Sequence, residues 1–247
     1  QICMLTVEAA LYKALVDKGI TPDVTAGLSL GEYGALIASG AMTMEDAFGV
    51  VRKRGIYMQE AVPTGGAMTA VLGLDPEKIE EICKETAQKE SAVVSIANYN
   101  CPGQIVITGQ KDAVDKAAAA CSEAGAKRAV PLKVSGPFHS KMLEGAGEKL
   151  GEALKDVEIH DIKVPYITNV TADYVASKDD VKDYLKRQVS SSVRWQQTIE
   201  RLIADGADEF IEIGPGRSLA GFMRKINRDV KVVNIDKLED FEKYVNR

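Results

Sequence analysis

The chain has 247 residues, of which 45% are hydrophobic and 27% are charged, and its net charge is −5. These values are those of a globular protein with one large core, or of one domain that carries a smaller insert. The negative net charge argues against general nucleic-acid binding, which needs a basic surface.

The first part of the chain predicts a strand, a tight turn and a helix in succession. A helical pattern covers residues 3–18, and residues 22–26 are apolar enough for a buried strand. The glycine-rich turn 27–31 follows, and the helix formers of residues 32–39 come directly after it. A further helix is predicted over residues 44–61.

The pattern of predicted secondary structure changes near Gly65. Strands and helices alternate there in the order β-α-β-β-α-β, which is the ferredoxin-like pattern. In chain order these elements are expected over residues 67–74, 76–89, 92–97, 104–108, 112–124 and 128–134. Asn100-Cys101-Pro102-Gly103 is typical of a turn between the two central strands. We therefore predict an inserted subdomain over residues 64–135.

The last part of the chain returns to strands that alternate with longer helices, which predicts a mostly parallel sheet. Helices are expected over residues 143–155, 179–189, 195–205 and 218–227. Strands are expected over residues 164–168, 208–213 and 231–235. Residues 1–63 and 136–247 are therefore predicted to form one α/β domain that the ferredoxin-like subdomain interrupts.

Gly27-Leu28-Ser29-Leu30-Gly31 matches the G-x-S-x-G nucleophile elbow. The serine of an elbow lies on a strained strand-to-helix turn, and we expect side chains two positions before and after it to collide. The backbone N–H of Leu30, at the start of the helix, is placed to stabilise an oxyanion. The motif is short, so a glycine-rich turn with an exposed serine is the alternative.

The segment Gly27-Leu28-Ser29-Leu30-Gly31-Glu32-Tyr33 resembles the GHSxGE signature of malonyl-CoA:acyl carrier protein transacylases and related polyketide-synthase acyltransferase domains. Further segments resemble that family in the expected order: residues 53–59, 98–104, 136–140, 186–188, 195 and 212–216. The resemblance covers essentially the whole chain. It implies an α/β-hydrolase-like domain that carries a ferredoxin-like subdomain.

The resemblance implies a catalytic dyad of Ser29 and His139. His139 would take the proton from Ser29 as it attacks a thioester, and would return it to the leaving thiol. A pKa near neutrality suits both steps. The main-chain carbonyl of Gln188 would orient the imidazole, with the Asn169 side chain nearby. Without the resemblance, His139 reads as a loop histidine and Gln188 as a helix-surface residue.

On the substrate side, the resemblance makes Arg54 the residue that holds the free carboxylate of a malonyl group. Without it, Arg54 would be read as part of a solvated helix face beside Arg52 and Lys53. In the polyketide acyltransferases that the chain resembles, phenylalanine at the position of Phe138 goes with malonyl and serine with methylmalonyl, because the ring crowds the space that a methyl branch would need. The resemblance therefore implies malonyl as the acyl group. The other implied substrate-binding residues are Met58, Asn98 and Asn100.

The sequence departs from the family pattern in two places. Leu28 stands where the family usually has histidine, which changes packing around the elbow and leaves the base in place. The family also begins with a strand and a loop whose glutamine N–H completes the oxyanion hole. This chain shows no such segment, so we expect an N-terminal segment to be missing and the rate to be lower by about 10²–10³.

The function implied is the ping-pong transfer of malonyl from malonyl-CoA, through a malonyl-Ser29 ester, to the phosphopantetheine thiol of acyl carrier protein in fatty-acid synthesis. Coenzyme A thioester is the substrate, and no permanently bound cofactor is expected. Three alternatives stay open: a discrete acyltransferase of a polyketide synthase, a serine thioesterase or hydrolase, and a non-catalytic module that docks a carrier protein.

Composition bounds the remaining properties. The cysteines Cys3, Cys83, Cys101 and Cys121 are widely spaced, which favours free thiols in a reducing compartment. The chain has 2 histidines, so we expect no metal site. No apolar run reaches the roughly 20 residues of a membrane span, and no signal peptide is visible. We therefore predict a cytoplasmic monomer that binds neither membrane nor nucleic acid.

Overall fold

A computed structural model describes residues 1–134 and 136–246 of the chain. Residues 135 and 247, each the last residue of a predicted segment, lie outside the described residues. The chain divides into two units, and each is described by itself. Unit 1 comprises Gln1–Arg52, Asp156–Val181 and Gln196–Arg247, and unit 2 comprises Lys53–Lys155 and Lys182–Trp195. Unit 2 contains the predicted insert and extends beyond it, so the boundaries at residues 64 and 135 stay a prediction.

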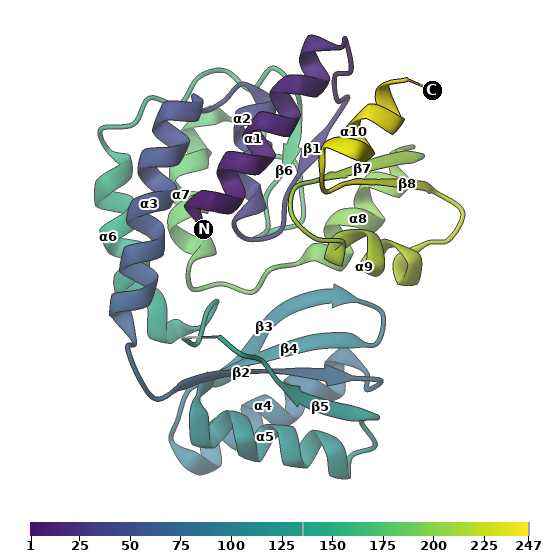
Figure 1. The fold of residues 1–247 in the computed structure, drawn as a ribbon. Helices are drawn as coiled ribbons and strands as arrows, with labels where there is room; N and C mark the ends of the chain where they lie inside the picture. Colours follow the sequence, from purple (N-terminus) through teal and green to yellow (C-terminus); the bar gives the residue numbers. More distant parts are fainter. Residues whose placement is uncertain (135, 247) are drawn as a thin grey trace. The chain divides into compact units, whose positions relative to one another are not determined.

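The strands of unit 1 form two parallel pairs (Figure 1). One pair joins β1 (Thr25–Ala26) to β6 (Tyr166–Ile167), and the other joins β7 (Glu209–Ile213) to β8 (Lys231–Ile235). The expected parallel pairing is therefore present, but as separate pairs and not as one sheet. The helices that lie mainly in unit 1 are α1 (Ile2–Asp17), α2 (Gly31–Ser39), α8 (Trp195–Ala204), α9 (Ser218–Ile226) and α10 (Leu238–Val245).

Helix α10 was not predicted from the sequence. Its Phe241 is buried in a cluster with Leu15 of α1 and Ile235 of β8. The apolar residues Leu238, Phe241 and Val245 recur at helical spacing, which is the signal that could have revealed it. This packing ties the last helix to the first one.

Unit 2 contains a four-stranded antiparallel sheet in the order β3-β4-β2-β5, with helices α4 and α5 on one face (Figure 1). Its strands are β2 (Gly66–Leu72), β3 (Val94–Cys101), β4 (Gln104–Gln110) and β5 (Arg128–Pro131). Its two covering helices are α4 (Pro76–Glu90) and α5 (Lys111–Glu123). The chain order is β-α-β-β-α-β, which is the ferredoxin-like arrangement.

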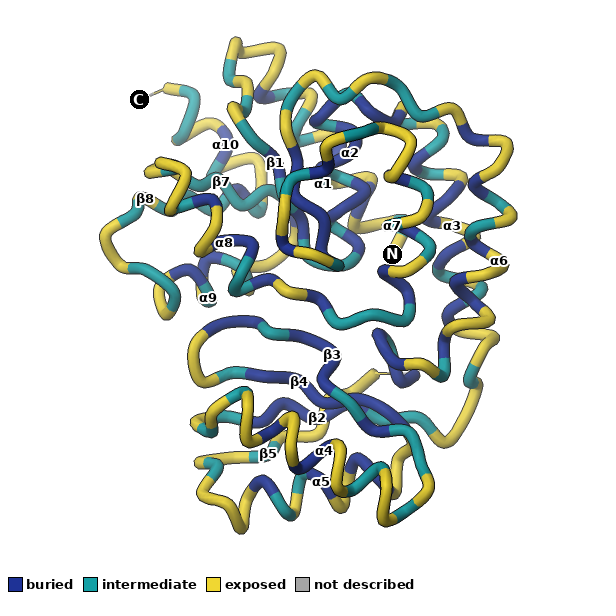
Figure 2. The backbone as a smooth tube through the Cα atoms, turned by 180° about the vertical axis from the view of Figure 1, so that it is seen from behind, coloured by how far each residue is buried: buried dark blue, intermediate teal, exposed yellow. Residues whose placement is uncertain are grey.

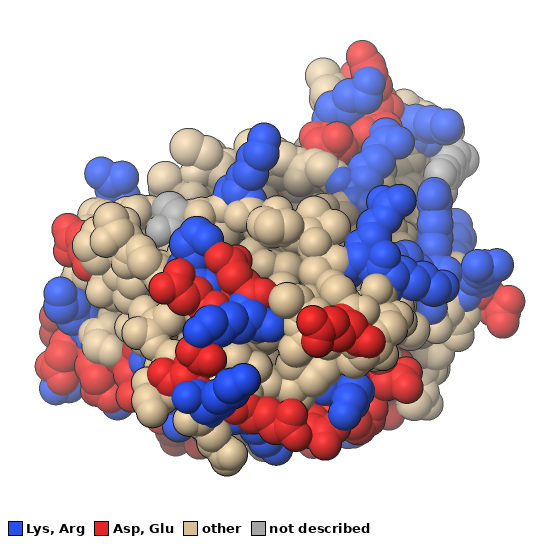
Figure 3. All heavy atoms as spheres, turned by 90° about the horizontal axis from the view of Figure 1, so that it is seen from below, with Lys and Arg blue, Asp and Glu red and all other residues tan. Residues whose placement is uncertain are grey.

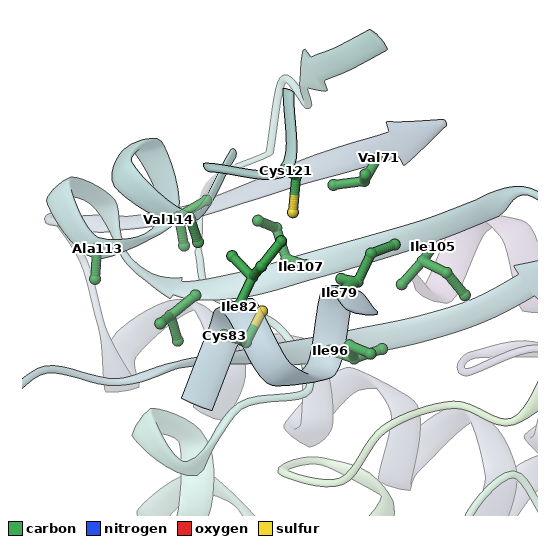
Figure 4. Packing of buried hydrophobic residues seen from close by; sticks show 12 residues of the cluster. Val71, Ile79, Ile82, Cys83, Ile96, Ile105, Ile107, Ala113, Val114 and Cys121 are labelled. Atoms are coloured by element: carbon green, nitrogen blue, oxygen red, sulfur yellow. The ribbon is translucent and has the colours of Figure 1, made fainter. Parts of the chain in front are cut away.

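The core of this sheet-and-helix layer is aliphatic. Ile79 and Cys83 of α4 point toward Ile107 of β4 and Cys121 of α5 (Figure 4). In Figure 2 strands β3 and β4 are largely buried, whereas α4 and α5 alternate between buried and exposed residues along their length. Burial raises the pKa of the Cys83 thiol to about 12 and that of Cys121 to about 11, so both thiols stay protonated at neutral pH.

The outer face of α4 and α5 carries acidic and basic side chains close together (Figure 3). Lys78 pairs with Glu81, and Lys111 pairs with Asp115 at 2.5 Å. Exposed pairs of this kind contribute little to stability, because water screens the two charges. The outer face is therefore a mixed-charge, solvated surface.

The turn between β3 and β4 is tighter than the sequence suggested. Strand β3 runs through Asn100 and Cys101, so the turn is Pro102-Gly103 alone. Gly103 has a φ of 71°, which glycine adopts without strain. The prediction of a turn that begins at Asn100 was therefore wrong, and Asn98 and Asn100 are strand residues.

Three further helices involve unit 2: α3 (Met44–Ala61), whose first half belongs to unit 1, α6 (Glu144–Leu154) and α7 (Val181–Gln188). Helix α6 packs so closely on α7 that a Cβ at Gly147 would lie 2.8 Å from the Lys186 carbonyl oxygen, and glycine is therefore required there. This close approach fixes the end of α7, where Gln188 lies. Across the described residues, no helix is both long and apolar enough to cross a membrane.

Candidate active site

Ser29 lies between β1 and α2, on the turn that the sequence predicts as a nucleophile elbow. Its φ is 53°, a left-handed conformation that is uncommon for a residue with a side chain. Leu30 precedes the first residue of α2, so the positive end of that helix begins directly after Ser29. The strand-turn-helix context that gives the motif its meaning is therefore present.

Steric fit explains one glycine of the elbow and not the other. A Cβ at Gly27 would lie 2.0 Å from both the carbonyl carbon and the carbonyl oxygen of Gly31, which no side chain tolerates. A Cβ at Gly31 would meet open space. The expectation that both glycines avoid a collision was right for Gly27 and wrong for Gly31.

Asn169 holds the elbow from a distant part of the chain. Its Oδ1 accepts a hydrogen bond from the Ser29 N–H at 2.5 Å, and its Nδ2 donates to the Gly27 carbonyl oxygen at 2.6 Å. The backbone N–H of Asn169 donates in turn to Oε2 of Glu32, which is fully buried on α2. One asparagine side chain therefore holds the turn at both Gly27 and Ser29.

Sequence reasoning placed Asn169 near the histidine and did not assign this bracing, and it gave Glu32 no part in the site. The side-chain bonds of Asn169 described above go to elbow residues. Glu32 matches the final glutamate of the GHSxGE signature, and this match could have indicated that it helps to hold the elbow.

His139 lies in a loop before α6 and has a φ of 60°. The hydroxyl of Ser140 donates to the Pro137 carbonyl oxygen at 2.7 Å and closes this turn. Gly66, the first residue of β2, leaves room for it, because a Cβ there would lie 2.3 Å from Cδ of Pro137. Both His139 and Ser140 are buried. The loop is therefore held by its own Ser140–Pro137 hydrogen bond and by packing of Pro137 against Gly66 of the sheet.

Gln188 joins two of the candidate residues. Its carbonyl oxygen lies 2.9 Å from Nδ1 of His139, and its side-chain Oε1 accepts from Nη2 of Arg54 at 3.1 Å. A carbonyl oxygen accepts and never donates, so Nδ1 carries the proton and Nε2 keeps its lone pair in the neutral ring. All three residues are buried in unit 2.

The electrostatic state of His139 differs from the one expected. Its pKa is lowered to about 4, mainly by burial and also by the Arg54 charge, although hydrogen bonds to the backbone of Gln188 and Ser191 act in the opposite direction. A pKa near neutrality was expected for a base that accepts and returns a proton. The imidazole is therefore neutral at pH 7, and it is a weak base.

Arg54 is 1% exposed, whereas Arg52 and Lys53 before it are exposed. The reading of Arg54 as part of a solvated helix face is therefore wrong. Met58, one turn later on α3, is also buried. An arginine charge that water does not screen attracts an anionic group strongly, and its planar guanidinium suits a carboxylate.

The remaining candidates gather on or beside the sheet of unit 2. Phe138 packs against the sheet residues Met68, Ala70, Ala97 and Val106. Asn98 and Asn100 are buried in β3. The segment after α7 pairs with this strand, since the Val193 N–H donates to the Ala97 carbonyl oxygen at 2.8 Å. Unit 2 thus contains Arg54, Met58, Asn98, Asn100, Phe138, His139 and Gln188, and unit 1 contains Ser29, Leu30 and Asn169.

Comparison with known proteins identifies the class. The family described as the acyl transferase domain matches residues 1–235, and the chain belongs to this family. A malonyl CoA-acyl carrier protein transacylase of Bacillus subtilis (strain 168) is 48% identical over 243 residues, which are 98% of this chain and 76% of that protein. The resemblance drawn from the motifs is thereby confirmed.

Solved structures agree with this assignment. The crystal structure of a protein described as MCAT from Streptococcus pneumoniae matches with a TM-score of 0.94 at 45% identity, over 98% of this chain and 79% of that one. A complex described as a type II polyketide acyl-carrier protein with its malonyl-transacylase matches with a TM-score of 0.94 at 38% identity, over 98% of this chain and 78% of that one. The α/β fold with its mixed sheets is therefore that of these transacylase structures.

Proposed function

We propose that this chain transfers a malonyl group from malonyl-CoA to the phosphopantetheine thiol of an acyl carrier protein. The observation that carries the proposal is the buried Arg54, which is joined through Gln188 to the buried His139. A hydrolase for neutral esters has no use for an unscreened guanidinium beside its base. An enzyme whose acyl group carries a free carboxylate does need one, because the guanidinium binds that carboxylate.

The proposed chemistry is a ping-pong exchange on Ser29. The Ser29 oxygen forms a bond to the thioester carbon while its proton passes to Nε2 of His139. The oxyanion that forms is stabilised by the Leu30 N–H at the start of α2. The C–S bond then breaks, and the coenzyme A sulfur leaves with the proton from His139. The carrier-protein thiol repeats the sequence in reverse, and free Ser29 is regenerated.

The remaining predicted residues receive roles on the same basis. Arg54 holds the malonyl carboxylate, Phe138 limits branching of the acyl group, and Met58, Asn98 and Asn100 line the acyl site. Asn169 holds the elbow that presents Ser29. We also propose the predicted division into an α/β-hydrolase-like catalytic domain, residues 1–63 and 136–247, and a ferredoxin-like subdomain, residues 64–135. A cytoplasmic location and a monomeric state stay predictions.

The test is intact-protein mass spectrometry after brief incubation with malonyl-CoA and, separately, with acetyl-CoA. We expect a malonyl adduct on the parent protein, little acetyl adduct, and no adduct on Ser29→Ala. Transfer of the adduct to a carrier protein from fatty-acid synthesis, in competition with one from polyketide synthesis, identifies the pathway. Release of coenzyme A with accumulation of free malonate and no adduct would contradict the proposal and indicate a hydrolase.

A further inference from the structure

Within unit 2, the residue proposed to select the substrate acts directly on the residue proposed as the base. Arg54 and His139 share one partner, because Gln188 accepts from Arg54 with its side chain and from His139 with its main chain. All three side chains are at most 4% exposed. Charge at Arg54 is therefore felt at His139 with little screening by water.

The pKa of His139 responds to a side-chain charge and to uncharged groups around it. Among the described residues that act on its titration, Arg54 on α3 is the charged one, and Gln188 and Ser191 contribute backbone groups. The sheet face beside its neighbour Phe138 is built from Met68, Ala70, Ala97 and Val106, which do not titrate. After burial, the Arg54 charge is therefore the next largest influence on how readily His139 accepts a proton.

With no acyl group bound, this arrangement gives a poor base. The pKa of His139 is held at about 4 by burial and by the Arg54 charge. A general base works best when its pKa lies near the operating pH. A carboxylate that pairs with Arg54 would neutralise that charge and remove its contribution to the lowering.

We propose that His139 becomes an effective base only when the acyl group carries a carboxylate that pairs with Arg54, and that Gln188 is the positioning residue that holds Arg54 for this coupling. The inference rests on the proposed function and deepens it. Selection of malonyl over acetyl is then expressed in the rate of acylation at saturating thioester as well as in binding. The Gln188 main chain keeps the His139 tautomer fixed, so its side chain is the part that tunes the coupling.

The direct test follows His139 by NMR titration of the ring signals of the Ser29→Ala variant, which binds a thioester without forming the ester. The chain has 2 histidines, so His160→Gln assigns the signals. We expect the His139 pKa to stay low with acetyl-CoA and to rise by about one pH unit or more with malonyl-CoA. Acetyl-CoA controls for the exclusion of water by the bound thioester. Equal titration with both thioesters would overturn the proposal.

The outcomes separate this inference from the proposed function. If malonyl-CoA leaves the whole spectrum unchanged, the chain does not bind it, and the proposed function fails together with the coupling. If malonyl-CoA shifts other signals while the His139 titration stays in place, the coupling alone is wrong. The same protein then still transfers malonyl through a base of fixed strength.

Substitution of Gln188 gives a second test, because Gln188→Glu places a permanent carboxylate beside Arg54 and keeps the main-chain acceptor. We expect its single-turnover acetylation at pH 7 to rise, its malonylation to fall, and the malonyl-to-acetyl ratio to drop about tenfold or more, the change that one pKa unit represents. The pH profile of acetylation should also move upward. Gln188→Met, which loses the side-chain acceptor without adding charge, should weaken the preference without moving the acetyl profile.

The matched control is Gln110→Glu, the same change at a side chain of unit 2 that accepts from the Val93 N–H. We expect this variant to keep the parent rates and pH profiles. A merely structural role for Gln188 predicts that its variants lower both acylation rates by one factor and leave the pH profiles in place. That result would overturn the proposal.

Discussion

The candidate residues of the two units are held in place by different interactions. In unit 1 the elbow is held by steric fit and by short hydrogen bonds of an uncharged side chain, since Asn169 spans Ser29 and Gly27. In unit 2 the histidine and the arginine are held in a buried environment where a positive charge acts on a titratable ring. The position of the proposed nucleophile therefore depends on steric fit and hydrogen bonds, whereas the proton affinity of the proposed base depends on burial and charge.

This difference predicts how the candidate residues of each unit respond to substitution and to a change of conditions. The elbow should tolerate changes of salt, but it should not tolerate a Cβ at Gly27, where the backbone of residues 27 and 31 lies in close contact. The base should tolerate small changes of shape and respond to any change of charge at Arg54 or Gln188. The substitutions below test these two expectations, beginning with the one that should have the greatest effect.

Gly27→Ala should disrupt the elbow most strongly. Its Cβ would lie 2.0 Å from backbone atoms of Gly31 and 2.6 Å from the Glu32 nitrogen, and backbone cannot move aside as a side chain does. We expect a loss of about 3 kcal/mol or more in the free energy of unfolding, or no folded protein. Urea denaturation followed by circular dichroism measures it.

Gly31→Ala is the matched control, because a Cβ there meets open space at the first residue of α2. Its stability should be unchanged or higher by up to about 1 kcal/mol, since alanine favours a helix over glycine. Equal destabilisation of both variants would show that sterics do not decide the glycine at position 27.

Asn169→Ala should have the next largest effect. It removes the side-chain partner of the part-buried Ser29 N–H and of the buried Gly27 carbonyl, and an unsatisfied buried group costs about 1–3 kcal/mol. Acylation by malonyl-CoA should fall about 100-fold or more, the factor that roughly 2.7 kcal/mol represents. Stopped-flow release of coenzyme A measures this rate.

Asn227→Ala provides the comparison, because the Asn227 side chain accepts from the Asp229 N–H in an exposed turn. It should change neither stability nor rate by a measurable amount. A stable and fully active Asn169→Ala protein would mean that the turn holds Ser29 in place without its brace.

The contrast between the candidate residues of the two units also explains what could be predicted from the sequence. The elbow is local: its five residues, the strand before it and the helix after it lie together in the chain, so the motif predicts the geometry. The ferredoxin-like order of unit 2 follows from short-range alternation of apolar patterns. Strand β3 was given too short a range because Asn-Cys-Pro-Gly carries turn residues, and its pairing with β4 extends it to Cys101.

The long-range contacts could not be read in this way. Asn169 lies 140 residues from Ser29, and Gln188 lies 134 residues from Arg54, so no local pattern joins them. The family resemblance supplied His139, Arg54 and Gln188 as a set, but it did not supply their electrostatics. The low pKa of His139 depends on its burial and on its distance from a charge, and both are properties of the folded chain.

Acid should destabilise the chain through His139. Its pKa is about 4 in the folded chain against 6.5 for an unperturbed histidine, so the unfolded chain binds more protons between these values. The free energy of unfolding should therefore fall as the pH drops from about 6.5 to about 4, by about 3 kcal/mol in total. His139→Gln should reduce this slope in urea titrations at several pH values. His160→Gln, at a partly exposed side chain, should keep the slope, and an unchanged slope in His139→Gln would contradict the buried, neutral state.

Glu8 of α1 should give the opposite and smaller slope in unit 1. Burial raises its pKa to about 7 from 4.5, because its carboxyl lies against Gly34 of α2 and Gly214 after β7. The folded chain then binds more protons than the unfolded chain, and the free energy of unfolding should fall as the pH rises from about 4.5 to about 7. Because the side chain is partly exposed, we expect a total of about 2 kcal/mol or less.

Glu8→Gln should remove this slope and raise stability at pH 8, whereas Glu45→Gln, an exposed carboxyl of the same unit, should do neither. Opposite slopes in the Glu8 and His139 variants would show that burial forces one group in each unit toward its neutral form. The proposed function gives the neutral ring of His139 a catalytic task, whereas the neutral carboxyl of Glu8 only permits close packing. A Glu8→Gln protein that lost acylation while it gained stability would break that distinction, because α1 would then act on the elbow through α2.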